Sequence, residues 1–250
     1  MAASRLKLIV AYDGAPFSGW QSQPNGNGIQ DHLENAFEQI CSQRVRVHGA
    51  GRTDAGVHAL AQCAHVDLPA RRYSTDRWRS ALNGVLPPAI RIVQCRFVAE
   101  SFHARFSAKG KVYSYRVWNT EVLMPLENGR VWHVRDPIDH ELVSSAAKWF
   151  LGRHDFSSFA AKRGAAVADP VRTLRKVRVR KTGPLLTFRF EGDGFLYKMV
   201  RMMVGALVQI GLHNESPNEI RARLDHSLGR IDKARNVAPA GGLFLIRVRY

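Results

Sequence analysis

Apolar residues recur along this chain with two periods, one typical of strands and one typical of helices. In residues 5–12, Leu6, Leu8 and Val10 alternate with charged or small side chains, which predicts a strand with one buried face. In residues 29–41 the apolar positions recur every three or four residues, the spacing of a helix with one apolar stripe. Both kinds of element therefore occur early in the chain.

Strands and helices alternate along the whole chain, and the order strand–helix–strand–strand–helix–strand occurs in each half. This order predicts an α+β fold of two similar modules with mostly antiparallel mixed sheets flanked by helices. We place the modules at 1–107 and 108–250, and expect Thr75 to cap its helix. The expected strands are 5–12, 44–49, 60–68, 90–98, 111–117, 171–181, 184–191 and 243–249, and the expected helices are 29–41, 75–85, 139–151, 195–211 and 217–226.

The predicted helix 195–211 is apolar on nearly every face, so we expect it to be buried. Arg201 stands among methionines and valines in this helix. A buried guanidinium costs free energy unless it meets an anion. A structural ion pair would satisfy it as well as a functional one would, and Asp54 is a candidate partner.

Charge narrows the class of partner. The chain has 37 basic and 21 acidic residues, a net charge of +16, spread along its length. A folded basic surface favours a polyanion, and nucleic acid is the leading candidate. A membrane surface is disfavoured because no predicted helix pairs a clean basic face with a clean apolar one.

Cysteine usage and hydropathy indicate a soluble cytoplasmic protein. Cys41, Cys63 and Cys95 form no C-x-x-C pair and leave an odd thiol, which argues against a disulfide scaffold and against a zinc site. No apolar run reaches the roughly 18 residues that span a bilayer. The start of the chain reads as a strand and not as a signal peptide.

Residues 49–59, Gly-Ala-Gly-Arg-Thr-Asp-Ala-Gly-Val-His-Ala, narrow the chemistry more than any other stretch. Asp54 is the one acid in a loop of small residues, with Arg52 beside it. A neighbouring cation keeps a carboxylate ionised, and a positioned carboxylate can act as nucleophile or base. Taken alone, the same spacing also fits a glycine-rich hairpin with Asp54 as a turn residue.

Bases and rings interleave over residues 102–118. On a strand Tyr113 and Tyr115 point to one face. Basic groups such as Arg105 can hold phosphates while a ring stacks on an unpaired base. The alternative is ordinary packing, which we expect for Phe106 and Tyr115.

Two further features carry weak signals. The loop over residues 12–21 has glycine hinges and an aromatic residue able to meet RNA. His48, His58 and His65 match no common zinc spacing, so we interpret them as surface or core residues. The glycines near Asp54 match neither nucleotide-binding pattern.

Together these motifs resemble the tRNA pseudouridine synthase A (TruA) family, nearly end to end. No single motif is decisive, but their order is highly specific. The matching segments are Tyr12-Asp13-Gly14, Gly19-Trp20-Gln21, Gly51 to Ala59, Phe102 to Ala108, Lys111 to Tyr115, Asp155 to Phe159, Gly194 to Arg201 and Gly242-Leu243.

The resemblance implies a cofactor-free, metal-free isomerase that converts uridine to pseudouridine at positions 38, 39 and 40 of tRNA. It implies Asp54 as the catalytic aspartate, Arg201 as its ion-pair partner and Tyr113 as the ring that stacks on the target base. Arg52 and Arg105 would hold the flipped nucleotide. It also implies a homodimer, and two similar halves that meet at a central basic cleft.

Three alternatives differ from this interpretation. A non-catalytic RNA-binding protein on the same scaffold would need no buried acid facing a buried base. A pseudouridine synthase for other RNA positions would keep Asp54, Arg201 and Tyr113. A hydrolase using Asp54 lacks the second carboxylate that glycoside hydrolysis usually requires.

Overall fold

The structure, a computed structural model, describes residues 4–69, 73–161, 169–225 and 236–250. Its contacts divide the chain into two units. The first runs to Lys109 and also includes Phe244–Tyr250, whereas the second is Gly110–Leu243. Most of the final strand therefore belongs to the first unit. The expected division at residue 107 into two consecutive modules does not include this return of the chain.

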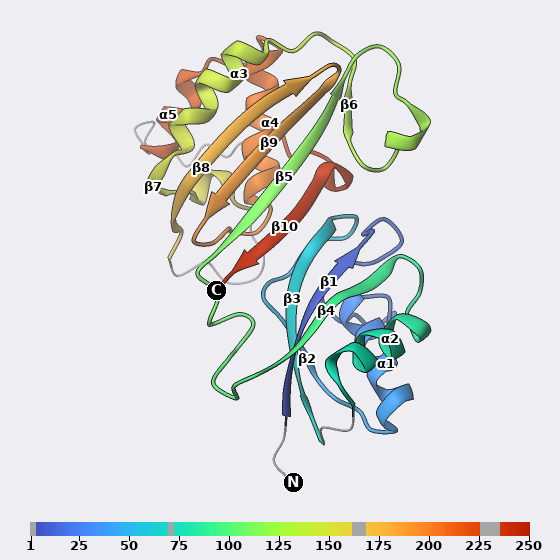
Figure 1. The fold of residues 1–250 in the computed structure, drawn as a ribbon. Coiled ribbons are helices and arrows are strands. Elements are labelled where there is room, and N and C mark those ends of the chain that lie inside the picture. The colour runs from blue at the N-terminus through green and yellow to red at the C-terminus, as the bar shows by residue number, and fades with distance from the viewer. Residues whose placement is uncertain (1–3, 70–72, 162–168, 226–235) are drawn as a thin grey trace. The chain divides into compact units, whose positions relative to one another are not determined.

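The first unit is a mostly antiparallel sheet with two helices packed beside it (Figure 1). Its strands lie in the order β4-β1-β3-β10, and β2 also pairs with β3. The pair of β10 with β3 is parallel, and the other pairs are antiparallel. The elements are β1 (Ser4–Tyr12), α1 (Ile29–Cys41), β2 (Val47–Gly49), β3 (His58–Leu68), α2 (Thr75–Val85), β4 (Ile90–Val98) and β10 (Leu243–Arg249).

The predicted periods explain the core of this unit. Leu6, Leu8 and Val10 are fully buried, as the alternation in β1 predicts. The expected cap of α2 was wrong by one residue. Ser74, not Thr75, precedes the helix. The Ser74 hydroxyl accepts a 3.3 Å hydrogen bond from the amide of Arg77, the third helical residue. A cap needs extended backbone, and Thr75 is already helical.

The second unit is also α+β, with strands in the order β5-β9-β8-β7 and β6 beside β5. The pairs are antiparallel except β5 with β6. Figure 1 shows α4 behind the strands of this sheet. The elements are β5 (Gly110–Asn119), β6 (Trp132–Val134), α3 (His140–Ala147), β7 (Gly152–Asp155), β8 (Val171–Thr182), β9 (Leu185–Gly192), α4 (Met199–Gly211) and α5 (Asn218–Leu224).

The buried helix of this unit, α4, starts later than predicted. It begins at Met199 and not at residue 195, because Lys198 has a left-handed backbone with φ +59° that a helix cannot continue through. From Met199 on, its residues other than Arg201 and Gln209 are buried, as predicted.

The other helices of this unit are shorter than predicted. α3 ends at Ala147, and a 3₁₀ turn at Lys148–Phe150 leads into β7, a strand that the sequence pattern missed. The helix expected at 217–226 is observed as α5, Asn218–Leu224, and the last residue of the expected range, 226, lies outside the described residues. The predicted α+β class is confirmed. No helix in the described ranges is long and apolar enough to cross a bilayer.

Candidate functional site

Asp54 lies in the connection between β2 and β3. It is half-buried, next to buried Thr53, whereas Arg52 is exposed. The connection turns back because the amide of Val57 donates to the carbonyl of Asp54 at 3.1 Å, and Gly56 supplies a φ of +78° in this turn. The loop therefore presents the carboxylate from a hydrogen-bonded turn.

The end of β1 and the loop after it hold the Asp54 turn from one side. The Tyr12 hydroxyl bonds to the Thr53 hydroxyl at 2.9 Å, and the Trp20 amide donates to the Thr53 carbonyl at 3.0 Å. Burial raises the pKa of Tyr12, so its hydroxyl stays protonated. Gly19 has φ +96°, and a Cβ there would lie 3.0 Å from the carbonyl carbon of Asp54. This close approach is possible only for glycine.

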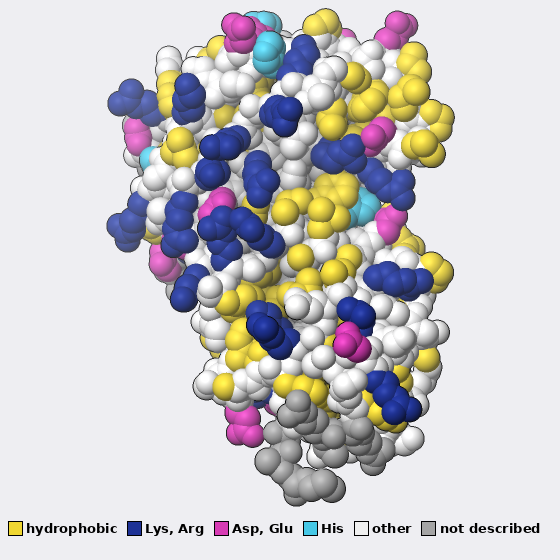
Figure 2. Space-filling model, in the orientation of Figure 1, with side chains coloured by type: hydrophobic (Ala, Val, Ile, Leu, Met, Phe, Trp, Pro, Cys, Tyr) yellow, Lys and Arg dark blue, Asp and Glu magenta, His cyan; other side chains and the backbone are white. Residues whose placement is uncertain are grey.

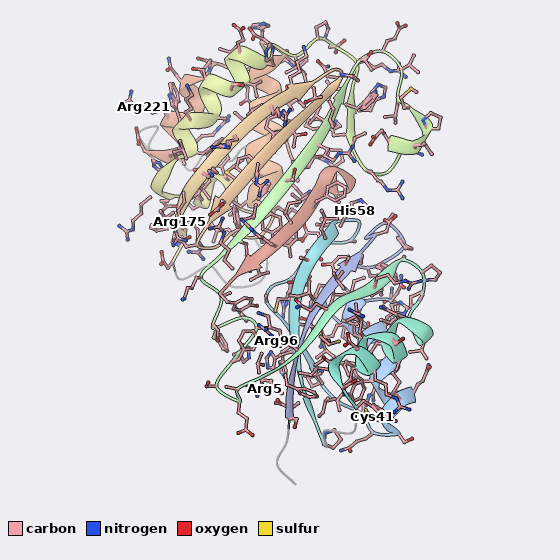
Figure 3. The ribbon with its side chains drawn as sticks, in the orientation of Figure 1. Arg5, Cys41, His58, Arg96, Arg175 and Arg221 are labelled. Carbon is pink, nitrogen blue, oxygen red and sulfur yellow. The ribbon has the colours of Figure 1, made fainter. Side chains whose placement is uncertain are left out.

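The same loop also contacts the far end of the turn. The amide of Gly14 donates to Nδ1 of His58 at 3.1 Å, and a Cβ on Gly14 would lie 2.1 Å from the Val57 carbonyl oxygen. His58, labelled at the start of β3 in Figure 3, is buried and stacks on Phe244 with 4.6 Å between ring centroids. His58 is therefore a core residue that supports the Asp54 loop, one of the two roles expected for it.

The aromatic residues of the loop over 12–21 are buried, so the expectation that one of them meets RNA was wrong. Trp20 is 2% exposed, and a Cβ on Gly49 would lie 2.5 Å from its ring nitrogen. Phe17 is also buried, with its ring edge on His32 at 5.1 Å. These rings anchor the loop that holds Asp54.

Arg105 is exposed in a turn that the His103 ring fixes. Nδ1 of His103 accepts the amides of Arg105 and Phe106 at 3.1 and 3.3 Å. The expectation that Phe106 packs in the core was wrong, because it is 77% exposed. Its ring lies 4.3 Å from the His103 ring and 5.7 Å from the Arg105 guanidinium carbon. The turn thus presents a cation and a ring to solvent.

Three histidine rings gather behind this turn. The centroid of the His65 ring lies 5.0 Å from that of His48 and 4.6 Å from that of His103, and the His48 and His103 centroids are 5.8 Å apart. Nδ1 of His65 accepts the amide of Ala104 at 3.1 Å. Burial, helped by the positive charge of Arg5, lowers the pKa of His65 to about 4, so the ring is neutral near pH 7. No cluster of possible metal ligands occurs among the described residues.

Tyr113 and Tyr115 lie on one face of β5, as predicted. Tyr115 is fully buried, and its hydroxyl donates to the Pro239 carbonyl at 2.7 Å, so its predicted core role is confirmed. Tyr113 is 8% exposed, and its ring meets Phe195 edge-on at 4.9 Å. The two tyrosines share a face but differ in their neighbours.

Arg201 lies in the first turn of α4 and is partly exposed, which distinguishes it from the methionines around it. Its Nε donates to the Ala238 carbonyl at 2.7 Å, and the Ala238 amide donates to the Arg201 carbonyl at 3.1 Å. Two bonds thus tie the guanidinium and its backbone to the chain before β10. Asp54, Arg52 and Arg105 belong to the first unit, and Tyr113 and Arg201 belong to the second.

The hydrogen-bonded loop that carries Asp54 and the net charge of +16 fit an enzyme that acts on a polyanion. Comparison with known families identifies which one. Residues 8–107 and 146–250 match the family model described as tRNA pseudouridine synthase. The chain belongs to this family of isomerases.

Individual relatives extend the match over the whole chain. A tRNA pseudouridine synthase A of Akkermansia muciniphila is 42% identical over 254 residues, covering 99% of this chain and 95% of the relative. One of Beijerinckia indica is 44% identical over 247 residues, covering 98% and 94%. A chain in the crystal structure of a Cbf5-Nop10-Gar1 complex is 12% identical, with a TM-score of 0.38 over 81% of this chain and 44% of that one, too distant to inform the site.

The two matched segments include Asp54, Arg52, Arg105 and Arg201, whereas Tyr113 falls between them. The sequence analysis did not predict that residues of the 12–21 loop hold the Asp54 turn. Their signal was present in the motifs Tyr12-Asp13-Gly14 and Gly19-Trp20-Gln21. A glycine beside an aromatic residue in a loop is consistent with many functions, so the motifs alone could not assign this one.

Proposed function

We propose that this enzyme isomerises uridine to pseudouridine in the anticodon arm of tRNA, at positions 38, 39 and 40, with Asp54 as the catalytic residue. Membership of the tRNA pseudouridine synthase family supports the reaction. The observation that most favours Asp54 is the support of its turn by three separate contacts, from Tyr12, Trp20 and Gly19. A carboxylate that must meet one sugar carbon needs such positioning.

The reaction breaks the bond from C1′ to N1 of uracil, turns the base over and forms a bond from C1′ to C5. The proton lost from C5 passes to solvent, and N1 gains a proton. Atoms and electrons balance within the nucleotide, so the stoichiometry requires no redox partner, and we propose that no metal or organic cofactor takes part. Asp54 acts either by attack on C1′ or by removal of a sugar proton.

The remaining residues would hold the charge and the base. An ion pair with Arg201 would keep Asp54 ionised and oriented. Tyr113 would stack on the uracil, and exposed Arg52 and Arg105 would bind phosphates of the extruded nucleotide. Extrusion of a stacked nucleotide costs a few kcal/mol, which these contacts would offset. The family resemblance further supports a cytoplasmic homodimer, which sedimentation analysis at several protein concentrations would test.

Mapping of modified positions tests this proposal. An unmodified tRNA transcript with uridines at 38, 39 and 40 is incubated with the enzyme in EDTA, and pseudouridines are located by carbodiimide-dependent stops of reverse transcriptase. The proposal predicts stops at these positions alone. Stops elsewhere would show a synthase for other RNA sites, and binding without stops would favour a non-catalytic RNA-binding protein.

A further inference from the structure

One face of the sheet in the second unit carries an unusual concentration of positive charge. The register places Arg178 of β8 opposite Arg189 of β9, and Arg180 opposite Thr187. Alternate residues of a strand share a face, so Lys176 lies on the same side. We call Lys176, Arg178, Arg180 and Arg189 the basic sheet face; all four are exposed. Figure 2 shows Lys and Arg side chains gathered over β8 and β9.

This face is the reverse of the one on which Tyr113 lies. In the β5–β9 register, Tyr113 pairs with Phe190 and Tyr115 pairs with Phe188, and these rings are buried on the side where α4 packs. Arg189 pairs with Ser114, so its side chain points the other way. The basic sheet face therefore lies on the opposite side of this sheet from the proposed base-stacking residue.

The arginines of this face have no carboxylate opposite them in the described strand register, where Arg180 meets Thr187. Arg178 and Arg189 stand directly opposite each other, where like charges destabilise a sheet. Glu191 lies on this face opposite Lys176 and is buried, and Glu127 pairs with Arg116 at 2.8 Å. Within the described ranges, none of the four cations of the basic sheet face makes an ion pair. Such an arrangement suits an external anion.

The side chains between the cations indicate the kind of anion. Ser114 and Thr187 occupy this face beside the arginines, and hydroxyl and guanidinium groups are the usual donors to phosphate oxygens. Successive cations on β8 lie about 7 Å apart, twice the rise per residue of a strand. An acidic protein partner would need an apolar centre to bind firmly, and the positions between these arginines hold small hydroxyl residues instead.

We propose that the basic sheet face binds the phosphate backbone of the substrate tRNA outside the anticodon arm. This inference rests on the proposed function. A base held by Tyr113 lies on the other side of the sheet, so the phosphates at Arg178 and Arg189 must belong to a different part of the same RNA. A whole tRNA has such a part, and an isolated anticodon arm does not.

The test compares two double variants that remove the same charge. Arg178→Gln with Arg189→Gln alters the face, and Arg96→Gln with Arg221→Gln alters two exposed arginines elsewhere, both labelled in Figure 3. Dissociation constants are measured by filter binding for whole tRNA and for the isolated anticodon arm, at several salt concentrations. Thermal melting checks that both variants are folded, and relief of the like-charge pair predicts no loss of stability for the first.

We expect the Arg178/Arg189 variant to bind whole tRNA at least tenfold more weakly, with the salt slope reduced by about two, one for each lost phosphate contact. The control and the isolated arm should change less than twofold. Whole-tRNA binding equal to the control, or equal weakening on the isolated arm, would overturn the proposal. Carbodiimide mapping on the same preparations distinguishes failure of this proposal from failure of the proposed function. If wild type modifies tRNA but the variant binds it as tightly as wild type does, only the role of the basic sheet face is refuted. If wild type neither binds nor modifies tRNA, both proposals are refuted.

Discussion

Gly19 approaches Thr53 so closely that a Cβ on the glycine would lie 2.7 Å from the threonine carbonyl oxygen. The contact joins the loop after β1 to the residue just before Asp54. Since Gly19 also has φ +96°, no other residue type fits without moving the Asp54 backbone. The position of the carboxylate thus depends on a glycine 35 residues away along the chain.

Gly19→Ala should therefore lower the rate of pseudouridine formation by at least tenfold. Gly26→Ala is the matched control, because Gly26 also has a positive φ, +65°, but no atom lies within 4 Å of its added Cβ. The control should lose about 1–2 kcal/mol of stability from the backbone alone and keep its activity. Turnover and urea unfolding of both variants check this, and equal activities would refute the positioning role of Gly19.

Arg201→Met should reduce turnover at least a hundredfold, because the methionine cannot pair with the Asp54 carboxylate. The structure adds a stability cost, since the variant loses the 2.7 Å bond to the Ala238 carbonyl. We expect about 1 kcal/mol from that bond. Arg221→Met, at an exposed arginine of α5, is the control and should change neither quantity. Full activity of Arg201→Met would remove the proposed ion pair.

Tyr113→Phe should keep its affinity for tRNA, because the ring and its contact with Phe195 remain. Tyr115→Phe should keep the wild-type rate but lose about 1 kcal/mol of folding free energy, since its hydroxyl donates to the Pro239 carbonyl. Single-turnover rates, tRNA binding constants and urea unfolding distinguish the two variants. A tRNA affinity for Tyr113→Phe more than tenfold below wild type would contradict a stacking role.

The lowered pKa of His65 predicts a pH effect on stability. Between the ordinary value of 6.5 and about 4, the unfolded chain binds a proton that folded His65 does not. The free energy of unfolding should therefore fall as pH decreases through this window, by up to about 1.4 kcal/mol per unit. His65→Asn keeps an acceptor for the Ala104 amide but does not titrate. Urea unfolding at pH 7 and pH 5 should show a smaller loss for this variant, and equal losses would exclude His65 as the cause.

The fold was largely predictable where a strong apolar period exists. The bounds of α1 and β4 agree with the prediction, and in α1 the apolar positions recur every three or four residues. The start of α4 was not predictable, because apolar residues continue upstream of Met199. Only the left-handed backbone at Lys198 prevents the helix from beginning earlier. The four-residue β7 is too short to show a period.

The candidate site was also predictable only in part. Asp54 could be identified from the sequence because it is the one acid among the small residues of its loop. The expectations that an aromatic residue of the 12–21 loop meets RNA and that Phe106 packs in the core were both wrong, since an aromatic residue in a loop has no periodic neighbours that show its environment. The hydrogen bond between the Tyr12 and Thr53 hydroxyls joins residues 41 positions apart. It could not be predicted from the sequence, because it depends on how the strands pair.

If Asp54 performs the chemistry of uridine isomerisation, the release of tritium from uridine C5 depends on its carboxylate. tRNA labelled with tritium at uridine C5 is incubated with wild type, with Asp54→Asn and with Asp76→Asn, a control at an exposed acid of α2. We expect release by wild type and by the control, and none by Asp54→Asn, although that variant still binds tRNA. Release by Asp54→Asn at the wild-type rate would exclude Asp54 as the catalytic residue.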